Sequence, residues 1–399
     1  MDSTQEAQAS QQAENYLPIG DYAVIGDLHT VALVGKNGSI DWCCLPRFDS
    51  PSVFGALLDT NKGGFFRIHP SDSHAHIARK QLYLPETNVL VTRFLTVDGI
   101  GEITDFMPIK QPDANEEDHT IIRSVAVVSG SLSFEMLCHP AFNYARDTST
   151  VTLSENGVSF HSQSSLLILS SSVPLKEDDQ GVHATFTIHA GQSVHFALEH
   201  VKANDHEPHP LSEDQYQELL QDTVHYWRNW LLQCRYQGRW REMVQRSALA
   251  LKMLTYAPTG AIVAAPTTSL PEDLGGDRNW DYRYTWLRDA SFSLYSLLLL
   301  GFTEEAEAFM KWLNERCHER GDNDSLQPMY GIDGKHELQE LTLDHLEGYR
   351  KSSPVHIGNG AYNQVQLDVY GEIMDAIYLY NRQSAISYQL WGDIIRLLS

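Results

Sequence analysis

The spacing of apolar residues changes near residue 203, and no other feature of the sequence constrains the fold as strongly. Up to that point, short runs of β-branched and aromatic residues are separated by turn residues, which is typical of β-strands. Beyond it, apolar residues recur at every third or fourth position, as they do along one face of an α-helix. The sequence therefore predicts a β domain followed by an α domain.

The first half predicts an antiparallel β-sandwich over residues 16–203. Alternation is clear at 184–189, where apolar and polar side chains would face opposite sides of a strand. At least nine candidate strands follow one another at the spacing of an antiparallel sandwich. They are 30–34, 40–45, 89–95, 121–128, 132–137, 158–162, 166–170, 184–189 and 193–200.

The second half predicts a helical domain over 213–399, after a polar, proline-containing linker at 204–212. Ser212 and Gln215 have the spacing of a capping box, which marks the start of the first helix. Further helices are expected at 240–256, 285–300, 303–317, 359–380 and 384–398. An α/α toroid, a bundle and a solenoid would all fit this periodicity.

Two stretches of this half, 258–283 and 321–358, are too long and too rich in aromatic and charged residues to be simple connectors. We expect them to be functional loops, because binding residues are concentrated on loops that a rigid scaffold holds in place.

The composition excludes several classes of partner. The chain has 29 Lys and Arg against 52 Asp and Glu, and a net charge of −23 repels nucleic acid and anionic membrane surfaces. No apolar stretch reaches the length of a transmembrane helix. Five cysteines lack paired zinc or redox spacing and are expected to be reduced thiols. Residues 1–15 lack a signal-peptide pattern, so we expect a disordered tail and a cytoplasmic location.

The densest group of functional side chains lies at 275–289, where a loop meets a helix. Sugar rings stack on Trp and Tyr, while their hydroxyls accept hydrogen bonds from Arg and donate to Asp. The group is therefore suited to a saccharide pocket. A salt-bridged aromatic cluster that only fixes the loop to the helix would have the same composition.

Four motifs in this chain resemble glycoside hydrolase family 15, which contains glucoamylases, glucodextranases and bacterial or archaeal trehalases. The run Asn-Trp-Asp-Tyr-Arg-Tyr-Thr-Trp-Leu-Arg-Asp-Ala at 279–290 is similar to the signature of that family. Residues 19–27 and 38–50 resemble a trehalase-like N-terminal domain. Residues 346–350, 354–361 and 364–368 continue the same resemblance.

The resemblance implies a β-sandwich followed by an (α/α)6 toroid, and inverting hydrolysis that releases glucose from a non-reducing end without a cofactor or metal. It implies that Trp286, Arg288 and Asp289 bind the hydroxyls of the terminal glucose. The other candidate substrate-binding residues are Trp280, Asp281, Tyr284, His356 and Asn359.

His356 departs from the family pattern, which has Arg at that position of the loop. A neutral imidazole does not replace a permanent cation. The change is interpreted either as an altered subsite or as tolerated variation in a loop that keeps its shape.

Inverting glycosidases need a catalytic acid and a catalytic base about 6.5–9.5 Å apart. The resemblance places both beyond Ser399, so we expect no catalytic residue in this chain and an incomplete toroid, with about six of twelve helices. Among the carboxylates of the two long loops, Asp281 and Glu347 could be considered as a catalytic pair. Loop-anchoring ion pairs are commoner than catalytic dyads, and the resemblance gives these two no catalytic role.

The sequence does not separate maltodextrin, isomaltose-type glucan and trehalose as the α-glucoside substrate, although the N-terminal motifs favour trehalose. The alternative function is that of a catalytically inactive saccharide-binding or assembly protein. The oligomeric state is not determined by the sequence.

Overall fold

The computed structural model describes residues 16–71, 77–109, 118–163, 165–202, 207–319 and 325–397. The chain divides into two compact units. The sheet unit comprises Met1–Arg228 and Leu346–Lys351, and the helical unit comprises Asn229–His345 and Ser352–Ser399. The predicted tail at 1–15 and residues 204–206 of the predicted linker lie outside the described residues. The domain bounds proposed from the sequence stay a prediction.

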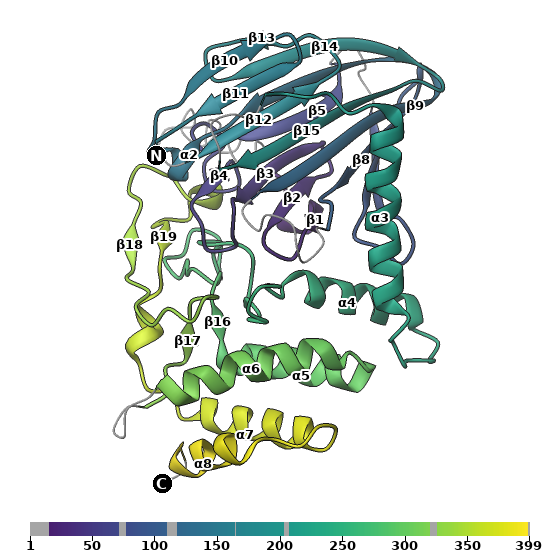
Figure 1. Ribbon diagram of the computed structural model, residues 1–399. Coiled ribbons are helices and arrows are strands. Elements are labelled where there is room, and N and C mark those ends of the chain that lie inside the picture. The colour runs from purple at the N-terminus through teal and green to yellow at the C-terminus, as the bar shows by residue number, and fades with distance from the viewer. Residues whose placement is uncertain are drawn as a thin grey trace. The chain divides into compact units, whose positions relative to one another are not determined.

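Within the described residues, the sheet unit has fifteen strands whose pairings are all antiparallel, which confirms the predicted antiparallel sheet (Figure 1). The strands are β1 (Tyr22–Gly26), β2 (Val31–Gly35), β3 (Ser39–Cys44), β4 (Ser52–Phe54), β5 (Phe65–Pro70), β6 (Ala78–Tyr83), β7 (Leu90–Leu95), β8 (Gly99–Phe106), β9 (His119–His139), β10 (Thr150–Ser154), β11 (Gly157–His161), β12 (Leu166–Ser171), β13 (Lys176–Glu177), β14 (Val182–His189) and β15 (Ser193–Val201).

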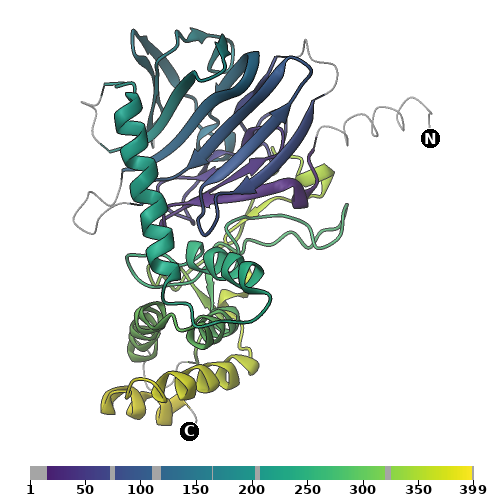
Figure 2. The same ribbon diagram turned by 90° about the vertical axis from the view of Figure 1, so that its right-hand side faces the viewer.

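The long strand β9 connects two sets of strands. Its first part pairs with β8 and β15, and its last part pairs with β5 and β14. Gly130 lies where the pairing changes and has a φ of 77°, a backbone conformation that favours glycine. Figure 2 shows the strands of this unit stacked in layers. The sequence predicts two separate strands here, 121–128 and 132–137, because the polar middle of β9 resembles a turn.

The core of the sheet unit lies between these two sets of strands. Phe66 and Phe134 from one set and Phe94 and Phe196 from the other belong to one buried hydrophobic cluster. Burying each of these rings stabilises the fold by about 1.5–3 kcal/mol. The alternating burial along β5, where every second residue is buried, follows from the period of a strand.

A segment far along the chain, Leu346–Lys351, packs with the sheet unit. The Tyr16 hydroxyl donates to Oε1 of Glu347 at 2.6 Å, and the Tyr349 hydroxyl donates to the carbonyl of Leu17 at 2.8 Å. The sequence gives no signal for this contact, because it joins residues more than three hundred positions apart.

The helical unit contains α4 (Arg241–Met253), α5 (Leu287–Leu300), α6 (Thr303–Glu319), α7 (Asp368–Asn381) and α8 (Tyr388–Leu397), while most of α3 (Glu213–Leu231) belongs to the sheet unit. Helix α5 packs against α6 and α7, and α6 packs against α8 (Figure 1). Gly301, in the left-handed conformation, ends α5 as a C-cap. The incomplete (α/α)6 toroid stays a prediction.

The predicted helix at 359–380 begins nine residues too early. Helix α7 starts at Asp368, and the preceding residues form a single 3-10 turn, Gly360–Asn363, followed by extended backbone at Gln364. The Asn359 side chain caps this turn by accepting from the Ala361 N–H at 3.0 Å. That local bond competes with a continuous α-helix.

Two short two-stranded sheets lie next to the helices. Strand β16 (Thr285–Trp286) pairs with β17 (Met329–Tyr330), and β18 (Leu341–Thr342) pairs with β19 (His356–Ile357). The first pairing joins the start of α5 to the second of the two predicted functional loops, 321–358.

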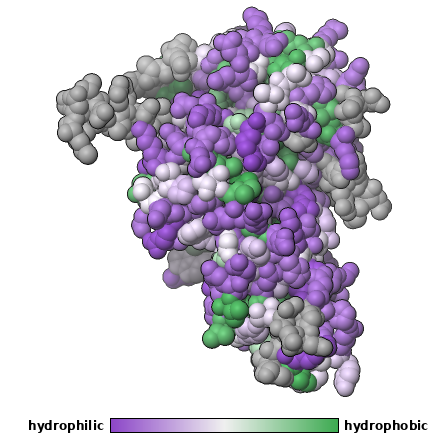
Figure 3. Space-filling view, turned by 90° about the vertical axis from the view of Figure 1, so that its left-hand side faces the viewer, coloured by the Kyte–Doolittle hydropathy of each residue, from purple (hydrophilic) through white to green (hydrophobic). Residues whose placement is uncertain are grey.

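Several large apolar side chains of the helical unit are exposed. Figure 3 shows green, hydrophobic patches on the otherwise hydrophilic surface of this part of the molecule. The exposed large side chains of this unit include Phe292 and Leu299 on α5 and, among the aromatic residues, Tyr378 on α7 and Tyr388 and Trp391 on α8. Within the described ranges, no helix combines the length and the apolar character needed to cross a bilayer.

The ion pair of Arg123 and Asp105 crosses the core of the sheet unit, with both side chains fully buried and Nε and Oδ1 2.8 Å apart. We expect Arg123→Ala to lower the free energy of unfolding by about 3–5 kcal/mol, because Asp105 would keep a buried and uncompensated charge. Arg93→Ala, which breaks a partly exposed pair with Glu102, should cost less than about 1 kcal/mol. Urea denaturation followed by circular dichroism measures the free energy of unfolding of both variants. Equal losses would contradict the stabilising role assigned to the buried pair of Arg123 and Asp105.

Candidate functional site

A pocket of about 400 Å³ lies in the helical unit, where the loop before α5 meets the loop before α7. Three of the predicted site residues, Trp280, Trp286 and Asn359, line it. The lining also includes Tyr282, Glu340, Gly360, Ala361, Gln364 and Gln366.

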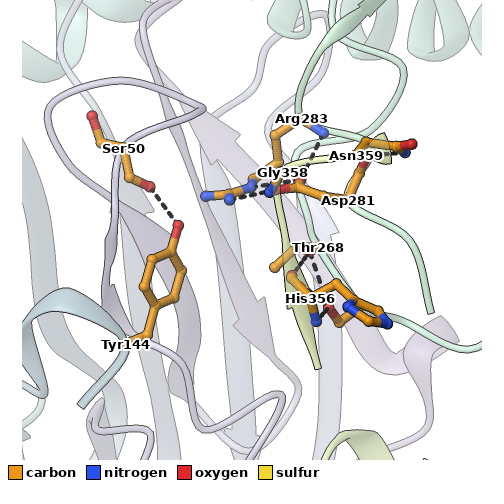
Figure 4. Close-up of polar contacts among 9 residues, drawn as sticks. Ser50, Tyr144, Thr268, Asp281, Arg283, His356, Gly358 and Asn359 are labelled. Atoms are coloured by element: carbon orange, nitrogen blue, oxygen red, sulfur yellow. Dashed lines mark hydrogen bonds and ion pairs between the residues drawn. The ribbon is translucent and has the colours of Figure 1, made fainter. Parts of the chain in front are cut away.

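Asp281 lies behind this pocket as a buried support. Its side chain is fully buried and forms a bidentate ion pair with Arg283, in which the carboxylate oxygens lie 2.9 Å from Nε and 2.7 Å from Nη2 (Figure 4). The same carboxylate accepts the Gly358 N–H at 3.1 Å, and the Asn359 amide donates to the Asp281 carbonyl at 3.0 Å. Asp281 and Asn359 therefore hold two loops together, and their polar groups are occupied by the protein.

Asn279 is a second buried connection between the same loops. Its amide nitrogen donates to the carbonyls of Gly276, Ser352 and Pro354 at 3.1–3.2 Å. Neither Asn279 nor Arg283 was a predicted site residue. Both lie inside the motif at 275–289, where their role could have been inferred only from the pairing of loops that are distant in sequence.

His356 supports the pocket through both its backbone and its ring. Its carbonyl accepts from the Thr268 and Ser269 hydroxyls at 2.6 and 2.8 Å (Figure 4). The imidazole stacks on Trp280, with ring centroids 5.9 Å apart and planes 15° apart. The ring therefore fixes the orientation of Trp280, which lines the pocket, and His356 itself is buried.

Trp286 and Tyr284 belong to a buried aromatic cluster with Met329 and Leu338. Trp286 is 9% exposed, and among the described residues its indole Nε1 has no hydrogen-bond partner. A buried N–H group gains by donating to a ligand, because leaving it unpaired costs free energy. Tyr284 is similarly buried, at 8% exposed, in the same cluster, and it does not line the pocket.

Arg288 and Asp289 occupy the first turn of α5 and remain 38% and 44% exposed. Arg288 forms an ion pair with Asp368 at 3.0 Å, at the start of α7, and its charged carbon lies 5.9 Å from the centre of the Trp286 ring. The hydrogen bond to Asp368 raises the pKa of Arg288 further and lowers that of Asp368. Two helix starts are thereby joined at the edge of the pocket.

Tyr282 belongs to the motif at 279–290, but it was not among the predicted substrate-binding residues. It lines the pocket, its ring lies 5.9 Å from that of Trp286, and burial together with the charges of Glu272 and Asp289 raises its pKa. Gln364 and Gln366 were missed because the segment was expected to be helical. In extended backbone, residues two apart point to the same side.

The arrangement combines aromatic faces, amide groups, the guanidinium of Arg288 and the partly exposed carboxylates of Asp289, Glu340 and Asp368 in and next to a single pocket. These groups match the C–H faces and hydroxyl pairs of a sugar ring. All eight predicted site residues lie in or next to this region, in two layers. Trp280, Trp286 and Asn359 line the pocket, Arg288 and Asp289 follow Trp286 in the first turn of α5, and Asp281, Tyr284 and His356 support the two loops.

Comparison with known proteins identifies the class. Residues 7–227 match the family model described as "Trehalase-like, N-terminal", and residues 238–398 match the model described as "Glycosyl hydrolases family 15". The chain therefore belongs to the family of proteins with a trehalase-like N-terminal domain, and its second part is similar to glycoside hydrolase family 15.

The similar curated proteins are trehalases. The trehalase of Mycolicibacterium smegmatis is 37% identical over 94% of this chain and 59% of its own length. Those of Thermoplasma volcanium and Thermoplasma acidophilum are 36% and 38% identical, over 97% and 92% of this chain and 61% and 62% of their lengths. The chain thus spans about 60% of the length of these relatives. A putative kojibiose phosphorylase from the human microbiome, with a TM-score of 0.46 and 10% identity, covers 91% of this chain and 49% of its own.

We expect Asp281→Ala to lower the stability of the helical unit by about 3–5 kcal/mol, because the change leaves the buried Arg283 without its counter-charge. Asp273→Ala is the matched control in the same loop, since Asp273 is 81% exposed and its pairing with Arg278 is weak. Thermal unfolding of both variants tests this. An unchanged midpoint for Asp281→Ala would show that the pair does not hold the loops.

Proposed function

We propose that the pocket binds the terminal glucose of an α-glucoside and that the protein is part of an inverting hydrolase of α-glucosidic bonds. The observation that carries the proposal is that Arg288 and Asp289 remain 38% and 44% exposed although they pair with each other at 3.4 Å and Arg288 also pairs with Asp368, whereas Asp281 is fully buried against Arg283. Exposed polar groups on a rigid and otherwise satisfied support are available to a ligand.

The side chains have distinct roles in this proposal. Arg288 donates to two adjacent hydroxyls and Asp289 accepts from one, so the pair fixes the orientation of the ring. Trp280 and Tyr282 offer aromatic faces, and the indole N–H of Trp286 is a further donor. Asp368 keeps the guanidinium in place before the sugar arrives, which reduces the entropic cost of binding. No cofactor or metal enters the reaction.

Trehalose is the substrate we propose, ahead of maltodextrin and isomaltose-type glucans. The support for this choice is the identity of 36–38% with proteins named trehalase, together with the match of residues 7–227 to a trehalase-like domain. Family membership alone would not separate these substrates, since one fold serves several activities.

We assign the catalytic acid and base to residues outside 1–399. The carboxylates near the site have other partners: Asp281 is paired with Arg283, and Glu340 accepts the Gly360 N–H at 3.0 Å. Glu347 belongs to the sheet unit and accepts the Tyr16 hydroxyl. The pairing of Asp281 with Glu347 as a catalytic dyad is therefore not proposed.

Titration calorimetry with a glucose-type iminosugar tests the binding role. We expect Arg288→Ala to weaken binding by about 10- to 100-fold, which corresponds to the loss of one or two charge-assisted hydrogen bonds. Arg278→Ala is the control, because this arginine before the same helix is 60% exposed and its ion pairs among the described residues are with Glu272 and Asp273. Equal affinity of both variants would overturn the proposed site.

A glucose-release assay on trehalose, maltose and maltodextrin tests the catalytic assignment. The 399-residue chain should bind sugar and release no measurable glucose. Turnover that is lost in Glu340→Gln or Glu347→Gln, with the fold kept in circular dichroism, would place a catalytic carboxylate within this chain.

A further inference from the structure

A group of metal-binding side chains lies in the sheet unit and has no part in the proposed glucose site. Asp27, His29 and His119 each offer one ligand atom, and these atoms lie within 4.8 Å of one another. Asp27 and His29 belong to the turn between β1 and β2, and His119 begins β9. The topology thus brings three donors together from positions about ninety residues apart.

The Asp27 carboxylate is fixed before any ion arrives. One oxygen accepts the backbone N–H groups of His29 and Thr30, each at 3.0 Å. The other lies 2.6 Å from Nδ1 of His119. With Asp27 5% exposed, the negative charge is held inside the protein, where an opposite charge is strongly favoured.

His119 has one ring nitrogen that the protein does not use. The residue is 2% exposed, and among the described residues its Nε2 has no hydrogen-bond partner. A histidine whose Nδ1 donates to a carboxylate presents the lone pair of Nε2 outward, and histidines that bind metal ions have this arrangement. Leaving the nitrogen unpaired in the interior would instead cost free energy.

The ring of His29 lies next to that of His119, with centroids 5.2 Å apart and planes 53° apart. Two imidazoles and one carboxylate form a mixed nitrogen and oxygen donor set. Such a set suits a zinc-like transition ion, whereas magnesium and calcium prefer oxygen ligands alone.

We propose that Asp27, His29 and His119 bind a divalent transition-metal ion of the zinc type. His29 and His119 supply nitrogen ligands, and Asp27 supplies the negative charge. The ion links the turn between β1 and β2 to the first residue of β9, and therefore stabilises the sheet unit. Its role is structural and independent of glucose binding.

Zinc binding by the untagged 399-residue chain tests the proposal. After treatment with EDTA, titration calorimetry with ZnCl2 should show one zinc per chain, and MgCl2 should give no comparable signal. Zinc should also raise the melting temperature, because an ion that binds only the folded state stabilises it. His29→Ala should weaken zinc binding by at least about tenfold. Because His29 lies in a turn and is only partly buried, we expect this variant to fold.

The control is His189→Ala, which removes an exposed histidine at the end of β14 and should bind zinc like the unchanged chain. Asp27→Asn provides a second variant, which keeps the size of the side chain and removes its charge. The proposal is overturned if the unchanged chain takes up no zinc, or if His29→Ala and His189→Ala bind it equally well while circular dichroism shows both to be folded.

Discussion

The buried ion pair between Asp281 and Arg283 is the interaction on which the geometry of the candidate site depends. Removing two charges from water is costly, and the cost is offset only when every hydrogen-bonding position is used. Asp281 meets this condition by also accepting the N–H of Gly358. The pair holds the Asp281 carboxylate in place, and the bonds of Asp281 to Gly358 and Asn359 fix the loop before α5 to the loop before α7, where the pocket lies.

The exposed part of the site is organised by this support. Because Asn359, His356 and Asn279 satisfy backbone groups of both loops, the aromatic walls at Trp280 and Trp286 are held in place. Arg288 is then positioned by Asp368 at the start of α7. Rigid support beneath a few exposed polar groups is the arrangement that lets a pocket select one orientation of a sugar ring.

Periodicity and motif composition predicted the change from strands to helices and the region of the pocket. They did not predict which residues of the motif face the ligand. Asp281 and Arg288 are both charged residues of one short motif, yet one is fully buried and the other is 38% exposed. That difference depends on which distant backbone groups need a partner. Gln364 and Gln366 were missed because a helix was expected at 359–380, whereas the Asn359 side chain caps a 3-10 turn there. The packing of 346–351 with the sheet unit was not predicted either, because nothing in the local sequence indicates a contact between residues so far apart.

The most direct test of the account is a crystal structure of this chain with a glucose-type iminosugar. We expect the sugar-like ring of the inhibitor to stack on Trp280 or Tyr282 and two of its hydroxyls to bond to Arg288 and Asp289, while Asp281 stays bonded to Arg283. A ligand bound elsewhere, or an empty pocket at saturating ligand with Arg288 and Asp289 bonded only to protein, would contradict it.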